Sequence, residues 1–244
     1  MSVSKPPQQL PLAVQLRDEF DFRSFCFAQV NIELETSLKR WMSEDGEPFI
    51  YIWSSETVGK THLLQAISQH LSEMNRQVCY IPMTEFVDYP VEALEGLDKF
   101  DFICVDDIQI LVGNEEWQLG IFHFFNRLMT FGSRLIITGD KPPLELELYL
   151  ADLKTRLASG LIFPLKDLSD DEKKIVFKYR AQLRGFEMSD EGADYIFNRI
   201  SRNMLALIRF LDRLDKSSLV AKRKLTIPFI KSVLDDDNNN YEMY

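Results

Sequence analysis

The stretch FIYIWSSETVGKTHLL, residues 49–64, decides the fold. It begins with an apolar run typical of a buried strand, passes through small and polar residues, and continues as an amphipathic helical pattern. Strand, loop and helix in this order form the context of a phosphate-binding loop, where backbone N–H groups and the helix N-terminus hold phosphates. The candidate loop comprises Ser54, Ser55, Glu56, Thr57, Val58, Gly59, Lys60 and Thr61, followed by His62.

The loop matches the pattern GxxxxGK[ST] except at its first position, where Ser54 replaces glycine. In such a loop Lys60 reaches the β- and γ-phosphates and the Thr61 hydroxyl ligates Mg²⁺. Glu56 departs from expectation, because it places a carboxylate close to the phosphates. An ordinary strand-to-helix turn is the alternative, but the GKT triplet and its context together favour a nucleotide site.

Two other apolar runs end in polar side chains. FDFICVDD ends in Asp106 and Asp107, and RLIITGD ends in Thr138 and Asp140. Because open α/β sheets bind ligands at the carboxyl ends of their strands, we expect Asp106 to orient Mg²⁺ and Asp107 to polarise an attacking water. Thr138 or Asp140 would bond the γ-phosphate or that water. Turn or cap chemistry is the alternative at both strand ends.

Five strand-type runs separated by helical patterns predict an α/β fold with a parallel five-stranded sheet covered on both faces. The strand runs are 49–54, 78–83, 100–107, 134–140 and 161–165, and the helical patterns lie near 60–75, 90–97, 114–131 and 145–158.

After residue 165 the pattern is helical. Ser169 and Glu172 form a capping box, and Gly185 is placed to end that helix. Further helices are expected from Ser189, over 203–221 and from Thr226. The predicted organisation is a flexible tail (1–16), a P-loop domain (17–165), a helical domain (166–234) and a disordered acidic end (235–244).

Composition excludes several classes of protein. With 28 Lys and Arg against 38 Asp and Glu, the 244-residue chain has a net charge of −10, which argues against binding duplex DNA through an overall positive field. No window approaches the ~18–20 apolar residues of a membrane helix, and no export signal begins the chain. Cys26, Cys79 and Cys104 form no CxxC pair, so we expect a soluble protein of the reducing cytoplasm.

The motifs GKTHLL (59–64), VDDIQ (105–109), ITGDKPP (137–143) and LKTRLASGL (153–161), with the capped helical domain, resemble the AAA+ domain of the bacterial replication initiator DnaA. The likeness covers nearly the whole chain and is greatest to short regulatory members of that family, which promote inactivation of the initiator. It implies a P-loop AAA+ base domain followed by a small all-α lid. It also implies bound ADP or ATP, or another nucleoside diphosphate, with Mg²⁺.

The resemblance also assigns roles. Lys60 and Thr61 match the Walker A residues, Asp106 and Asp107 match Walker B, and Asp140 matches sensor 1. Arg156 matches the arginine finger, which acts in trans on nucleotide held by a neighbouring molecule; from the sequence alone it could equally cap its own helix. The sensor 2 arginine of the family falls at Leu205, so Arg209 or Arg202 is the candidate replacement.

The N-terminal segment resembles the short Gln-Leu-x-Leu peptide that docks on the DNA polymerase sliding clamp, with Gln9, Leu10, Leu12 and Val14 as its contacts. The last expected helix leaves no room for a DNA-reading helix-turn-helix domain, and the basic cluster at 222–224 fits a solvated helix end. Expected partners are therefore the clamp and the initiator, with a homodimer possible and no sequence-specific DNA binding.

The function that follows is negative regulation of replication initiation, by stimulating ATP hydrolysis on the initiator through Arg156. Ser54 and Leu205 suggest a chain that binds nucleotide better than it hydrolyses it, with weak intrinsic ATPase activity at most. A self-contained ATPase or helicase-loader-like motor is the alternative, and a small-molecule phosphotransferase is a third class.

Overall fold

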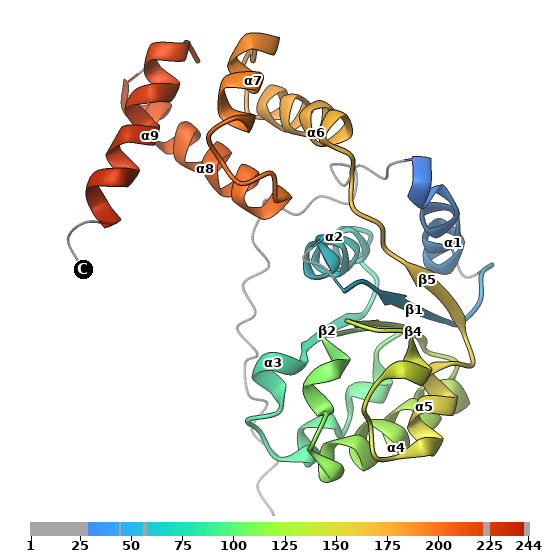
Figure 1. Ribbon diagram of the computed structural model, residues 1–244. Coiled ribbons are helices and arrows are strands. Elements are labelled where there is room, and N and C mark those ends of the chain that lie inside the picture. The colour runs from blue at the N-terminus through green and yellow to red at the C-terminus, as the bar shows by residue number, and fades with distance from the viewer. Residues whose placement is uncertain (1–28, 44, 56–57, 222–224, 242–244) are drawn as a thin grey trace, which may run out of the picture.

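The computed structural model describes residues 29–43, 45–55, 58–221 and 225–241, without the side chains of Gln29, Leu205 and residues 218–221 and 236–241. In these residues five parallel strands form one sheet in the order β2-β3-β4-β1-β5 (Figure 1). The strands are β1 (Phe49–Trp53), β2 (Val78–Pro82), β3 (Phe102–Asp106), β4 (Arg134–Gly139) and β5 (Leu161–Pro164). The predicted α/β fold and parallel five-stranded sheet are confirmed.

Helices cover both faces of the sheet (Figure 1). The helices α1 (Ile32–Met42) and α2 (Lys60–Glu73) pack on one face, and α3 (Met83–Phe86), α4 (Glu115–Phe131) and α5 (Ala151–Leu157) pack on the other. Alternate strand residues serve the two layers: Tyr51 joins the α4 layer, while Ile50 and Ile52 join the α2 layer. Burial on both faces explains why the strands are apolar throughout.

Two predicted helices are shorter than expected. The segment near 90–97 forms 3-10 turns, η3 (Val91–Leu94) and η4 (Leu97–Lys99), separated by Gly96 at φ +80°. The segment 145–158 is helical only in α5, after a turn η6 (Pro143–Glu145). Leu146 and Leu148 are buried there, and their spacing of two residues suits extended chain rather than helix. Helix α1 was not predicted.

The second domain contains α6 (Asp170–Leu183), α7 (Asp190–Phe197), α8 (Met204–Ala221) and α9 (Ile227–Tyr241). These helices pack around a core that includes Phe177, Phe210 and Ile230. Helix α9 continues to Tyr241, beyond residue 234 where the helical domain is expected to end. None of the helices in the described residues is long and apolar enough to cross a bilayer.

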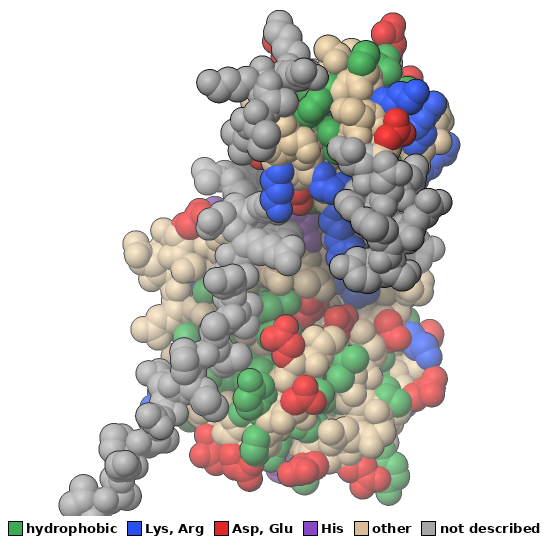
Figure 2. Space-filling view, turned by 90° about the vertical axis from the view of Figure 1, so that its left-hand side faces the viewer, with side chains coloured by type: hydrophobic (Ala, Val, Ile, Leu, Met, Phe, Trp, Pro, Cys, Tyr) green, Lys and Arg blue, Asp and Glu red, His purple; other side chains and the backbone are tan. Residues whose placement is uncertain are grey.

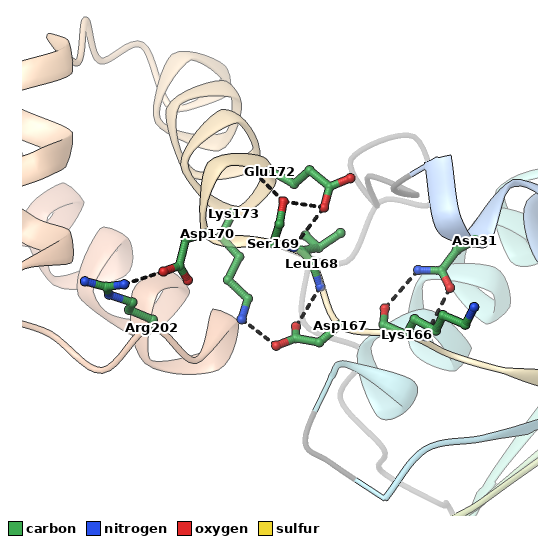
Figure 3. A network of polar contacts seen from close by, with 9 residues as sticks. All are labelled: Asn31, Lys166, Asp167, Leu168, Ser169, Asp170, Glu172, Lys173 and Arg202. Carbon is green, nitrogen blue, oxygen red and sulfur yellow. Dashed lines mark hydrogen bonds and ion pairs between the residues drawn. The ribbon is translucent and has the colours of Figure 1, made fainter.

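Polar contacts fix the connection between the two domains (Figure 3). The buried Asn31 side chain donates to the Lys166 carbonyl at 2.9 Å and accepts from its N–H at 3.1 Å, as a neighbouring strand would. Lys173 pairs with Asp167. The predicted capping box is present, with the Ser169 N–H donating to Glu172 at 2.8 Å. The start of α6 is therefore anchored to both domains.

Candidate nucleotide site

The predicted P-loop lies between β1 and α2. Gly59 precedes α2 at φ +99°, a left-handed conformation that glycine adopts without strain. Lys60 begins the helix, and its Nζ donates to the backbone oxygen of Ser54 at 2.8 Å, so the side chain lies back across the loop. Glu56 and Thr57 lie outside the described residues. The unsatisfied N–H groups of the first turn of α2 can bind an anion here.

Asp106 is the polar centre of the site. It ends β3 with only 2% of its surface exposed, and its carboxylate bonds the hydroxyls of Thr138, Tyr80 (2.9 Å) and Thr61. Burial raises the pKa of Asp106 above its ordinary value, while these hydroxyl donors oppose the rise. The two predicted Mg²⁺ ligands, Asp106 and Thr61, are therefore brought together.

This donor set fits Mg²⁺, which is held by one or two carboxylates completed by waters and substrate phosphates. Within the described residues no group of three His, Cys, Asp or Glu side chains forms an all-protein metal site. A site that holds Mg²⁺ would therefore depend on the nucleotide phosphates. Bound there, Mg²⁺ would neutralise phosphate charge, and Asp106 and Thr61 would hold it.

Thr138 joins the ends of β3 and β4. This fully buried hydroxyl donates to Asp106 and accepts the Asp107 N–H at 3.0 Å. Asp107 is a non-glycine residue with φ +60°, and Gln109 donates to its carboxylate at 2.9 Å. Such a backbone conformation costs about 1–3 kcal/mol and persists where its surroundings enforce it, as at functional sites. The positive φ of Asp107 turns the backbone away from the direction of β3.

Asp140 follows β4 at the same edge. Gly139 packs so closely that a Cβ there would lie 2.0 Å from the Tyr51 hydroxyl oxygen, and that hydroxyl donates to the Lys141 carbonyl at 2.9 Å. Within the described residues, one buried carboxylate oxygen of Asp140 has no hydrogen-bond partner. Burial lowers the pKa of Lys60, whereas the charges of Asp107, Asp106 and Asp140 oppose that shift. These three carboxylates are therefore close enough to act on Lys60.

The lid reaches this site through a residue that the sequence did not reveal. Arg180 of α6 is 4% exposed, and its Nη2 lies 3.1 Å from Nε2 of His62 in the first turn of α2. By contrast, Arg202 pairs with Asp170 within the lid (Figure 3), and Arg209 is exposed on α8. In the face shown in Figure 2, Lys and Arg side chains gather on the lid above an acidic base.

His62 gives this contact a pH dependence. Burial and the charge of Arg180 lower its pKa from 6.5 to about 3. Between these values the unfolded chain binds a proton that the folded chain does not, so stability falls as pH decreases below 6.5. From pH 7 to pH 5, without nucleotide or metal, we expect the wild type to lose about 2 kcal/mol more unfolding free energy than His62→Gln. Denaturant titrations of both proteins measure this difference, and equal losses would contradict the buried neutral histidine.

Arg156 lies apart from these contacts. It is an exposed residue in the last turn of α5, and its side chain forms no hydrogen bond or ion pair with any residue that the structure describes. The start of its helix is fixed by the buried Gln118, which donates to the Leu111 carbonyl at 2.8 Å and accepts the Leu150 N–H at 3.0 Å. Helix α5 therefore presents Arg156 to solvent.

A parallel sheet with a P-loop after β1, a buried aspartate ending β3, polar groups after β4 and a helical lid define an AAA+ P-loop protein. A model of the bacterial DnaA ATPase domain matches residues 16–164, and a model of the Hda lid domain matches residues 170–234. The chain belongs to the DnaA family of AAA+ proteins and is close to Hda.

Solved structures share the fold. Domain III of the Thermotoga maritima initiation protein DnaA superposes with a TM-score of 0.75 at 21% identity, over 90% of this chain and 97% of that one. AMPPCP-bound DnaA from Aquifex aeolicus gives 0.69 at 23% identity, over 81% and 65%. A variant of Thermotoga maritima RuvB gives 0.64 at 17% identity, over 91% and 72%. At identities below 25%, these similarities show a shared fold and nothing more.

Proposed function

We propose that this chain is a negative regulator of replication initiation that stimulates hydrolysis of the ATP bound to the initiator DnaA. The observation that carries the proposal is Arg156: an exposed guanidinium in the last turn of α5, with no partner among the described residues. A guanidinium inserted into a neighbouring site stabilises charge on the transferring phosphoryl group and accelerates hydrolysis by roughly 10³ to 10⁵. Membership of the DnaA family supports the initiator as that neighbour.

The chain's own site would hold ADP or ATP with Mg²⁺. Support comes from Lys60 at the start of α2, the Asp106–Thr61 pair and the unbonded Asp140 oxygen. Ser54 in place of the first P-loop glycine and Leu205 at the sensor 2 position favour binding over turnover. Weak intrinsic ATPase activity at most is therefore expected.

A self-contained ATPase or helicase-loader-like motor is the second candidate, favoured by the negative charges of Asp107 and Asp106 that act on Lys60. ATPase activity of the purified chain without partners discriminates the two. Turnover at a motor's rate would support the motor, and slow or undetectable turnover would support the regulator.

The regulator would reach the initiator in the cytoplasm through the DNA sliding clamp. Gln9, Leu10, Leu12 and Val14 would dock on the clamp: the amide sets the register and the apolar side chains fill a groove. These residues lie outside the described part of the chain. Clamp tethering raises the effective concentration of Arg156 near DNA-bound initiator without any new contact.

Deleting residues 1–14 is expected to abolish clamp binding and to leave nucleotide affinity unchanged, because the deletion does not touch the P-loop. Surface-immobilised clamp and labelled ADP measure the two properties in the same protein. A control chain with Gln8→Ala, which lies outside the proposed contacts, should keep both. Clamp binding that survives the deletion would contradict the tether while leaving the role of Arg156 open to its own test.

A further inference from the structure

The contact between Arg180 and His62 is where the lid meets the first turn of the P-loop helix. The two residues are 118 positions apart in the chain, and their side-chain nitrogens are 3.1 Å apart. Helix α2 lies on the side of the sheet nearest the lid (Figure 1). With 4% of its surface exposed, Arg180 is among the few charged side chains buried in the described residues.

The chemistry of the pair fixes how it bonds. A guanidinium can only donate, so Nε2 of His62 must accept and the ring proton must lie on Nδ1. An imidazole that accepts through Nε2 carries one ring proton, so His62 is neutral in this arrangement. The contact is therefore a hydrogen bond from the Arg180 cation of the lid to the neutral His62 ring of the base.

The position of this cation matters because phosphates bind at the same end of α2. The N-terminus of a helix carries partial positive charge, and Lys60 adds a full charge in the same turn. A buried guanidinium close by adds to that field with little screening by water. An anion bound on the P-loop attracts Arg180 and adds negative charge at the end of α2 that this guanidinium faces. The interaction energy of Arg180, a residue of the lid, therefore depends on whether an anion occupies the P-loop.

We propose that Arg180 is a positioning residue that couples nucleotide occupancy of the P-loop to the position of the lid, through its bond to His62. The inference rests on the nucleotide binding proposed above and is independent of Arg156. The lid arginines considered from the sequence are less suited to this role: Arg202 is held by Asp170, and Arg209 is exposed. Bound phosphates attract Arg180, and because Arg180 belongs to α6, the position of that helix changes with the attraction.

Hydrogen exchange of the full chain with and without ADP and Mg²⁺ tests the coupling. In the wild type, ADP should slow exchange both in the first turn of α2 and in α6. In Arg180→Gln, saturating ADP should still protect α2 but no longer α6, and ADP affinity should fall about 10-fold, within the usual range of coupling between sites. His62→Leu should reproduce this behaviour, and His62→Gln, which keeps an acceptor, should largely restore it.

Arg184→Gln is the matched control, because Arg184 lies four residues after Arg180, directly after the last residue of α6, and pairs with Asp212 inside the lid. It should keep both the affinity and the protection of α6, even where it lowers stability. Wild-type affinity together with wild-type protection of α6 in Arg180→Gln would overturn the coupling alone. Absence of any ADP-dependent protection in the wild type would overturn both the coupling and the nucleotide site.

Discussion

Replacing Arg156 by alanine is expected to reduce clamp-dependent hydrolysis of initiator-bound ATP by about 10³-fold, the lower end of the effect of an arginine finger. The guanidinium is exposed on α5 and forms no hydrogen bond or ion pair with the described residues, so its loss removes little from the fold. ADP affinity and clamp binding should stay at wild-type values. Arg156→Lys should rescue poorly, since an ammonium lacks the planar fork that bonds two phosphate oxygens.

The alternative role for Arg156 is a favourable interaction with the C-terminal end of its own helix. That role is worth about 0.3–1 kcal/mol and would lower only the unfolding temperature. Lys154→Ala is the matched control, because it removes another cation from the last turn of the same helix. Hydrolysis that is unchanged in Arg156→Ala, or equally reduced in Lys154→Ala, would rule out a finger at this position.

Replacing Lys60 by alanine is expected to weaken ADP binding roughly 30- to 150-fold, the equivalent of about 2–3 kcal/mol for a hydrogen bond to a charged group. Lys60 begins the P-loop helix, and its Nζ already lies within 2.8 Å of Ser54 across the loop. Equilibrium titration with fluorescent ADP gives the affinity of both proteins.

Lys39→Ala is a suitable control, since Lys39 is exposed on α1 and pairs there with Glu35, one turn away. Its ADP affinity should equal that of the wild type. Retention of full affinity by Lys60→Ala would remove the P-loop from the account of nucleotide binding. If Lys60→Ala loses ADP binding but keeps a folded lid and the wild-type unfolding temperature, the effect is due to the lost phosphate contact.

The strands could be predicted to within two residues at either end because each is a short apolar run bounded by polar or turn residues. β3 is an example: all of its residues are buried, and Asp106, the first polar residue after Phe102–Val105, ends the strand. Helix α1 was missed although its buried residues Leu34, Leu38 and Trp41 have helical spacing. The chain before α5 is extended although leucines favour helices, because Leu146 and Leu148 alternate with exposed residues as in a strand.

In the candidate site, the residues that follow the strand ends could be predicted from the sequence. The residues contributed by a neighbouring strand or by the lid could not. Thr61 and Asp106 meet because parallel strands place their carboxyl ends at one edge. Tyr80 bonds Asp106 from the neighbouring strand β2, which requires the strand order, and a tyrosine in an apolar run gives no sign of it. The contact of Arg180 with His62 depends on how the lid packs on the base. No local sequence pattern predicts a contact between residues 118 positions apart.

The central claim is that this chain acts on nucleotide held by another AAA+ protein. The most direct measurement is a single-turnover assay with purified initiator carrying labelled ATP, clamp loaded on DNA, and this chain filled beforehand with unlabelled ADP. We expect rapid conversion of the labelled ATP to ADP on the initiator only when both clamp and chain are present. Conversion at the same slow rate with and without the chain would contradict it.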